Sequence, residues 1–164
     1  MAPRLTTCLP FPTLPRVAEV QQSYSTIIEA PVALCYEAIA DFESYPSWAG
    51  PVTKTVVLDR NDDGTPRQVE FFLDMKLKTV RYVLAYDWTP PGGLTWQLVE
   101  GDLAGVDGHY SFEPEGDART QATCSQAVSL GFWVPSVIRG PIEQNAVRQS
   151  VLEFKAEVER RASS

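Results

Sequence analysis

The residue best suited by type to acid–base chemistry is His109, the only histidine of the chain. An unperturbed imidazole titrates at about pH 6.5, so it can exchange protons near neutrality. In a strand, residues two apart point to the same side, and His109 then shares its side with Asp107, Ser111 and Glu113. A polar row of this kind is typical of a solvated face. We expect His109 to lie at the surface, and the sequence identifies no catalytic residue.

Glu70 and Asp74 are four residues apart in a segment with strand periodicity, so both carboxylates fall on one side of it. The other side is apolar, and directing carboxylates into a dry cavity would be costly. We expect both to face solvent, and the phase of Arg81 in the next segment also directs it outward.

Metal chemistry is not expected. Cys8, Cys35 and Cys124 are odd in number and widely separated, without CxxC spacing. This pattern fits neither a disulfide framework nor a zinc site, and one histidine excludes a histidine-rich site. We expect no metal, no cofactor and a reducing, cytoplasmic location.

The composition indicates one domain and limits its partners. The 164 residues are enough to bury a sizeable core. Fourteen basic and 21 acidic residues give a net charge of −7 without a basic cluster. Nucleic acid and anionic membrane surfaces are therefore not expected partners. No apolar run approaches the roughly 20 residues that span a bilayer, so stable membrane insertion is not expected.

Residues 1–18 are predicted to form an irregular arm. They contain Pro3, Pro10, Pro12 and Pro15, which remove hydrogen-bond donors and restrict the backbone. The same prolines interrupt the apolar stretch that a signal peptide requires. We place the folded domain at residues 19–162.

Strand periodicity dominates the domain. A first strand is predicted at Val20–Ile28, and a helix opens at Pro31, followed by a short helical segment that ends near Trp48. Alternation then predicts further strands at Val52–Asp59, Gln68–Met75, Thr79–Trp88, Leu94–Val99, Gly105–Glu113 and Arg119–Leu130. Short turns between them, such as the one containing Asp63-Gly64, indicate an antiparallel meander.

One long helix is predicted from Pro135 to Arg161. Val147, Val151, Phe154 and Val158 recur at helical spacing and form one apolar face. Pro141 should kink the helix. Because no other element is large enough, this helix must cover the apolar face of the sheet.

Three segments carry a resemblance to a known superfamily: IEAPVALCYEAIADFESYPSWAGPV (Ile28–Val52), GHYSFEPEGDART (Gly108–Thr120) and VPSVI (Val134–Ile138). Over residues 20–161 the chain resembles the START-like (SRPBCC) superfamily, in its polyketide cyclase/dehydrase and coenzyme Q-binding branch. The resemblance implies an α+β helix-grip (START/Bet v1-like) fold. In that fold a curved antiparallel sheet, accompanied by two short N-terminal helices, wraps around the C-terminal helix and encloses an elongated hydrophobic cavity.

Strand phases and the resemblance together nominate cavity residues. The candidate ligand-binding residues are Trp48, Phe71, Leu73, Met75, Tyr82, Leu84, Trp96, Tyr110, Ile138, Ile142 and Asn145. An aromatic body with a polar tip suits a core as well as a cavity, so both readings stay open for Tyr82 and Tyr110, and core is favoured for Trp96. The helix stripe through Ile138, Ile142 and Asn145 has solvent exposure as its alternative.

The superfamily hosts carriers, receptors, enzymes and co-chaperones, so the site must decide the function. We expect binding or transport of a hydrophobic small molecule, such as a lipid, isoprenoid quinone or polyketide, by a monomer or homodimer. A polyketide aromatase/cyclase-dehydratase is the first alternative, and a protein-interaction module is the second. Cyclisation needs a base and an oxyanion donor, and the inward phases supply tyrosines but no base, which favours binding over catalysis.

Overall fold

The computed structural model describes residues 21–164. Its elements are β1 (Gln21–Ile28), α1 (Val32–Ala40), the 3-10 helix η1 (Phe42–Ser44), α2 (Tyr45–Trp48), β2 (Val52–Arg60), β3 (Pro66–Asp74), β4 (Thr79–Thr89), β5 (Gly93–Gly101), β6 (Gly105–Glu115), β7 (Arg119–Ser129) and α3 (Ser136–Ala162). This order confirms the predicted α+β succession of elements. The arm predicted for residues 1–18 and the boundary at residue 19 lie outside the described residues.

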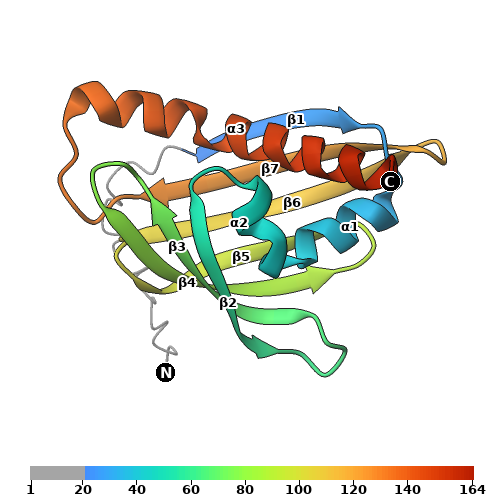
Figure 1. Cartoon of the computed structure of the whole chain (residues 1–164), viewed down its shortest axis with the longest axis horizontal. Coiled ribbons are helices and arrows are strands. Elements are labelled where there is room, and N and C mark those ends of the chain that lie inside the picture. The colour runs from blue at the N-terminus through green and yellow to red at the C-terminus, as the bar shows by residue number, and fades with distance from the viewer. Residues whose placement is uncertain (1–20) are drawn as a thin grey trace, which may run out of the picture.

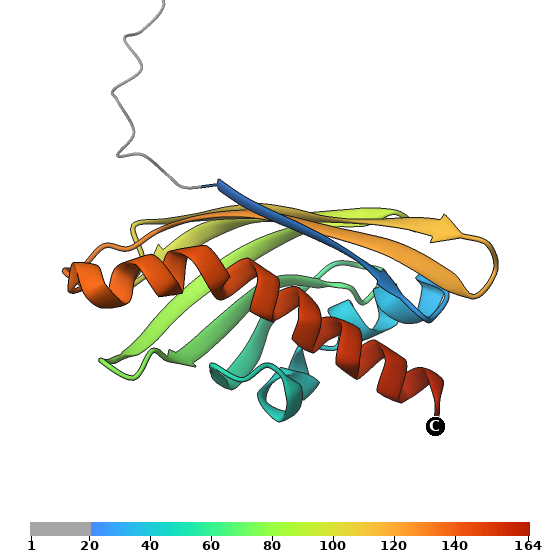
Figure 2. The same cartoon turned by 90° about the horizontal axis from the view of Figure 1, so that it is seen from above.

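The seven strands form one antiparallel sheet in the order β1-β7-β6-β5-β4-β3-β2. Strands β2 to β7 follow one another as the predicted meander, because each consecutive pair is joined by a short turn. At the β2–β3 turn, Gly64 has a φ of 89°, a conformation that glycine adopts without a steric penalty. The first strand pairs with the last, with Gln21 opposite Ala127. The sheet curves around α3, as the helix-grip fold requires (Figures 1 and 2).

Helix α3 packs on the sheet through the predicted face. Val147, Val151, Phe154 and Val158 are all buried. The helix runs on through Pro141, and Figure 2 shows that its N-terminal part takes a different direction from the rest. A proline inside a helix removes one backbone hydrogen bond, which permits such a bend.

Interlocking aromatic rings fill the space beneath α1, η1 and α2. The ring of Phe42 lies 4.8 Å from those of Tyr45 and Tyr86, centroid to centroid. Tyr110 lies 5.4 Å from Phe154 of α3. These separations are those of favourable aromatic pairs. This half of the concave face is therefore solid core, and a cavity has room only in the other half.

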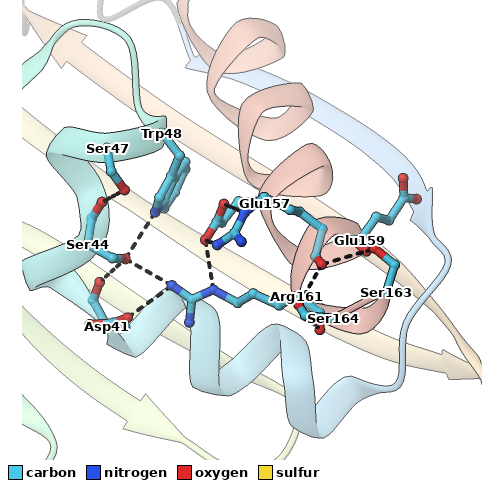
Figure 3. A network of polar contacts seen from close by, with 10 residues as sticks. Asp41, Ser44, Ser47, Trp48, Glu157, Glu159, Arg161, Ser163 and Ser164 are labelled. Atoms are coloured by element: carbon cyan, nitrogen blue, oxygen red, sulfur yellow. Dashed lines mark hydrogen bonds and ion pairs between the residues drawn. The ribbon is translucent and has the colours of Figure 1, made fainter.

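A polar network fastens the C-terminal half of α3 to the segment before α2 (Figure 3). Arg161 donates to the carboxylate of Asp41 at 2.9 Å and to Oγ of Ser44 at 3.0 Å. Its Nε also donates to Glu157 at 2.9 Å, and the indole of Trp48 donates to the same Ser44 hydroxyl. The network holds α2 against α3 at the end of the sheet opposite the cavity described below.

Candidate ligand-binding cavity

A cavity of about 130 Å³ lies between the sheet and the N-terminal half of α3. Its walls are formed by Gln22, Leu73, Met75, Val80, Tyr82, Leu103, Val106, Gln126, Val128, Leu130, Ile142, Ala146 and Val147. Ten of these thirteen side chains are aliphatic or methionine. The cavity thus offers an apolar environment with three polar groups.

Strand alternation directs the wall residues inward. Leu73 is opposite Val80 in the β3–β4 ladder, and Val106 is opposite Val128 in the β6–β7 ladder. Cross-strand partners point to the same face of a sheet, so each pair presents two side chains to the cavity. Helix α3 closes the space from above with one residue from each of two successive turns, Ile142 and Ala146, and with the neighbouring Val147.

The polar groups of the wall are uncharged. Burial raises the pKa of Tyr82 above its ordinary value of 10, so its hydroxyl stays protonated and can donate. Gln126 accepts a hydrogen bond from the indole Nε1–H of Trp96 at 3.1 Å through Oε1. An amide bound in this way directs its NH₂ group elsewhere. Tyr82 and Gln126, with Gln22, could therefore bind a carbonyl or hydroxyl of a ligand.

No Asp, Glu, His, Lys or Arg is among the wall residues. Within residues 21–164, no group of three or more His, Cys, Asp and Glu side chains is placed to hold a metal ion. The cavity wall can therefore bury apolar surface and hydrogen-bond a neutral group, but it offers no side chain that titrates near neutral pH.

Four of the nominated residues meet in this cavity: Leu73, Met75, Tyr82 and Ile142. Four others are buried in the packed core and are not among its wall residues: Phe71, Leu84, Trp96 and Tyr110. Trp48 is half-buried and packs on Tyr45, at 4.6 Å between ring centroids. The phase of a strand residue determines the face it points to, but not which part of that face it occupies.

The three nominated residues of the long helix do not all reach the cavity. Ile142 reaches the cavity wall, whereas Ile138 and Asn145 are exposed and do not. The predicted solvent alternative holds for these two. A helix residue turns by about 100° per position, so only one narrow line of the stripe can point at the sheet.

Several wall residues were not nominated from the sequence. They include Gln22, Val80, Val106, Gln126 and Val128. The alternation along β7 contained the signal for Gln126, because it shares its phase with the apolar residues of that strand. A polar residue in an apolar phase is the pattern that would have identified it.

The charged candidates lie outside the cavity. His109 is exposed, as predicted, on the face of the sheet away from α3. Arg81 is paired with Glu70 and, at 3.0 Å, with Glu100. These ion pairs neutralise outward charges of neighbouring strands, and none of the three residues is among the wall residues of the cavity.

The hydroxyl of Tyr110 is buried without a well-formed hydrogen bond among the described residues, and the thiol of Cys124, a weak partner, is the polar group beside it. Burial raises the pKa of this phenol well above its ordinary value, and the nearby Cys124 thiol adds to the effect. A buried hydroxyl without a partner costs stability. The structure gives Tyr110 the surroundings of a core residue that retains an unused polar group.

Comparison with known proteins identifies the family and supports the fold. The family model described as polyketide cyclase/dehydrase and lipid transport matches residues 28–155. A START superfamily protein from Mycobacterium smegmatis superposes with a TM-score of 0.77 at 19% identity, covering 86% of this chain and 98% of that one. The Zhui aromatase/cyclase from Streptomyces sp. R1128 gives 0.72 at 19% identity, covering 87% and 94%. No curated protein matches the chain significantly. At these identities the structural likeness shows the fold alone.

Proposed function

Because the chain belongs to the polyketide cyclase/dehydrase and lipid transport family, we propose that it binds an uncharged hydrophobic small molecule in the cavity beneath α3 and releases it chemically unchanged. The ligand classes that fit are a lipid, an isoprenoid quinone or a polyketide. Each combines extensive apolar surface with a carbonyl or hydroxyl, which is the combination that the wall can receive.

The observation that carries the proposal is the composition of the wall. Aliphatic side chains surround the space, and its polar groups are the hydroxyl of Tyr82 and the amides of Gln22 and Gln126. Ligand sites are generally apolar cavities with a few placed polar groups that fix orientation. The hydrogen bond from Trp96 supports this role for Gln126, because it holds the amide in one orientation before a ligand arrives.

The size of the cavity limits what it can enclose. Its volume of about 130 Å³ is close to that of an engineered apolar cavity of about 150 Å³ that binds benzene. One ring, or the end of one chain, would fit inside without rearrangement. The rest of a larger ligand would have to extend beyond this space.

Catalysis is the second candidate, supported by the structural likeness to an aromatase/cyclase. Tyr82 could donate to a developing enolate oxygen. Cyclisation also needs a general base within hydrogen-bond reach of the acidic carbon. The described wall has no such base, and burial shifts the pKa of Tyr82 further from neutrality. Binding without reaction is therefore favoured.

Native mass spectrometry of the protein purified from its own cells tests the proposal. We expect a bound hydrophobic molecule whose mass does not change on extended incubation. Tyr82→Phe and Gln126→Leu should each weaken retention about fivefold, the equivalent of one hydrogen bond of about 1 kcal/mol. Tyr110→Phe is the matched control, because its hydroxyl does not reach the cavity wall.

Two results would overturn the binding proposal. One is a protein without ligand that also fails to take up quinones, fatty acids or polyketide mimics. The other is cyclisation of a polyketide mimic well above the buffer rate, abolished by Tyr82→Phe. That second result would show that the protein is an enzyme.

A further inference from the structure

Exposed apolar side chains occur in the β3–β4 turn, the β7–α3 loop and the first turn of α3, which border one end of the cavity. Leu77 in the β3–β4 turn is 53% exposed, Trp133 before α3 is 84% exposed, and Val137 and Ile138 in its first turn are 84% and 38% exposed. We call these four residues the apolar tip. The other large apolar side chains of comparable exposure in the described chain are Leu58 on β2, Val99 on β5 and Leu152 on α3. Clustered apolar exposure of this kind indicates an interaction site.

The segments of the tip meet only in the folded chain. Nζ of Lys78 lies 4.4 Å from the ring centroid of Phe132, which joins the β3–β4 turn to the β7–α3 loop. The backbone N–H of Ala104 donates to the carbonyl of Ser129 at 2.9 Å and brings the β5–β6 turn to the same end. All three segments contribute residues to the cavity wall. Figures 1 and 2 both show this end away from the C-terminus.

The expectation that anionic membranes are not partners rests on the charge of the whole chain, and the charge of the tip differs from it. Lys76 and Lys78 flank Leu77 and are exposed. Two acids lie at the same end: Asp74, whose carboxylate accepts the backbone N–H of Lys76 at 2.8 Å, and Asp102 of the β5–β6 turn, whose carboxylate accepts the backbone N–H of Arg81 at 2.9 Å. Residues 127–142 contain no Asp or Glu. The three bases Lys76, Lys78 and Arg139 therefore outnumber these two acids at the apolar end of a chain whose net charge is −7.

We propose that the apolar tip docks on the surface of an anionic lipid bilayer. Trp133 and Leu77 would enter the interfacial layer, where indole rings are favoured. Lys76 and Lys78 would lie at the level of the anionic headgroups and be attracted to them. The rest of the chain is acidic, as the net charge of −7 for the whole chain requires, and is repelled from such a surface, which orients the molecule with the tip and the adjoining end of the cavity toward the lipid.

Docking requires no bound ligand and stands independently of the proposed function. The role of docking in ligand exchange does rest on that function, because a cavity that opens at a bilayer could exchange a hydrophobic molecule without exposing it to water. Such an encounter is peripheral and reversible. It agrees with the finding that no described helix has the length and apolar character to cross a membrane.

Vesicle flotation with the full chain tests the docking. We expect the protein to float with vesicles of phosphatidylcholine containing phosphatidylglycerol and to stay behind with phosphatidylcholine alone. Trp133→Ala should weaken partitioning about tenfold through lost apolar burial. The double variant Lys76→Gln/Lys78→Gln should weaken it about thirtyfold on anionic vesicles, since each lysine near such a surface contributes about 1 kcal/mol.

The matched controls are Leu58→Ser, an exposed apolar residue on β2 near the β2–β3 turn, and Lys54→Gln, an exposed lysine on β2. All variants retain residues 1–20, so differences between them report on the substituted side chains. Binding that is equally weakened by the controls would overturn the proposal. So would a wild-type chain that floats with neither vesicle, which would leave a protein partner as the occupant of the tip. Ligand retention is measured on the same variants without vesicles, which separates this outcome from failure of the cavity proposal.

Discussion

Trp96 and Gln126 are joined by a hydrogen bond of 3.1 Å although their strands, β5 and β7, are not neighbours. Gly108 of β6 lies between them and is paired in register with both. A Cβ on Gly108 would stand 2.5 Å from Cζ2 of the indole. The missing side chain lets Trp96 lie across β6, and in this way a glycine positions the amide of the cavity wall.

Gly108→Ala should therefore disturb both the core and the cavity. The added methyl would meet the indole ring and also the carbonyl of Ser125, at 2.7 Å. Overpacking of this kind typically costs about 1–3 kcal/mol, so the midpoint of thermal unfolding should fall by several degrees. Ligand retention should also weaken. Gly140→Ala is the control, because a Cβ there meets nothing within 4 Å. It should raise the midpoint slightly, since alanine favours a helix over glycine. A similar loss in both variants would contradict the account of Gly108.

Removing the unused hydroxyl of Tyr110 should not destabilise the protein. Its phenol has no partner better than the weakly hydrogen-bonding thiol of Cys124, so Tyr110→Phe should leave the free energy of unfolding unchanged or raise it by about 1 kcal/mol. Tyr45→Phe is the comparison, because that hydroxyl donates to the carbonyl of Ile39 at 2.6 Å. It should lose about 1 kcal/mol in urea unfolding. A loss in Tyr110→Phe as large as in Tyr45→Phe would show that Tyr110 has a partner.

Two arginines that share Glu157 should differ in their contribution to stability. The Arg161 side chain is 18% exposed and also binds Asp41, whereas Arg160 is 67% exposed. Arg161→Gln should cost about 2–3 kcal/mol, because it leaves a buried carboxylate with one partner fewer and releases α2. Arg160→Gln should cost less than about 1 kcal/mol, as for exposed ion pairs. Chemical unfolding measures both, and equal costs would contradict the structure.

The carboxylate of Glu157 also gives the stability of the protein a specific pH dependence. Hydrogen bonds from Arg160, and then from Arg161, lower the pKa of Glu157 from 4.5 to about 2 in the folded protein. The unfolded chain therefore binds a proton first as pH falls, and the stability contributed by this group is full above pH 4.5 and disappears toward about pH 2. The stability difference between the native protein and Glu157→Gln should shrink across that window. A difference independent of pH would contradict the assignment.

His109→Ala should change neither unfolding nor ligand retention. The imidazole is exposed on the outer face of the sheet, away from the cavity. Thermal unfolding and native mass spectrometry provide the two measurements. A tenfold weaker retention, equivalent to about 1.4 kcal/mol, would place the histidine in the site and reopen the acid–base hypothesis.

The elements could be predicted from the sequence because periodicity is a local property. Alternation was enough to direct Leu73 and Tyr82 to the concave side, since neighbouring side chains of a strand point to opposite faces. Helical spacing identified Val147 and Phe154 as buried residues of α3 for the same reason. The family resemblance then supplied the arrangement of these elements, and the structure confirms it.

Tertiary packing alone decided where the cavity lies. Tyr82 and Tyr110 have equivalent phases in their strands, yet Tyr82 lines the cavity and Tyr110 packs against Phe154. The difference arises because α1, η1 and α2 add rings over one half of the sheet and leave the other half to α3. Likewise, Leu77 and Trp133 belong to segments that are separate in sequence and meet at one end of the fold. Local periodicity determines the direction of a side chain, but its neighbours come from distant elements, and only the folded chain brings them together.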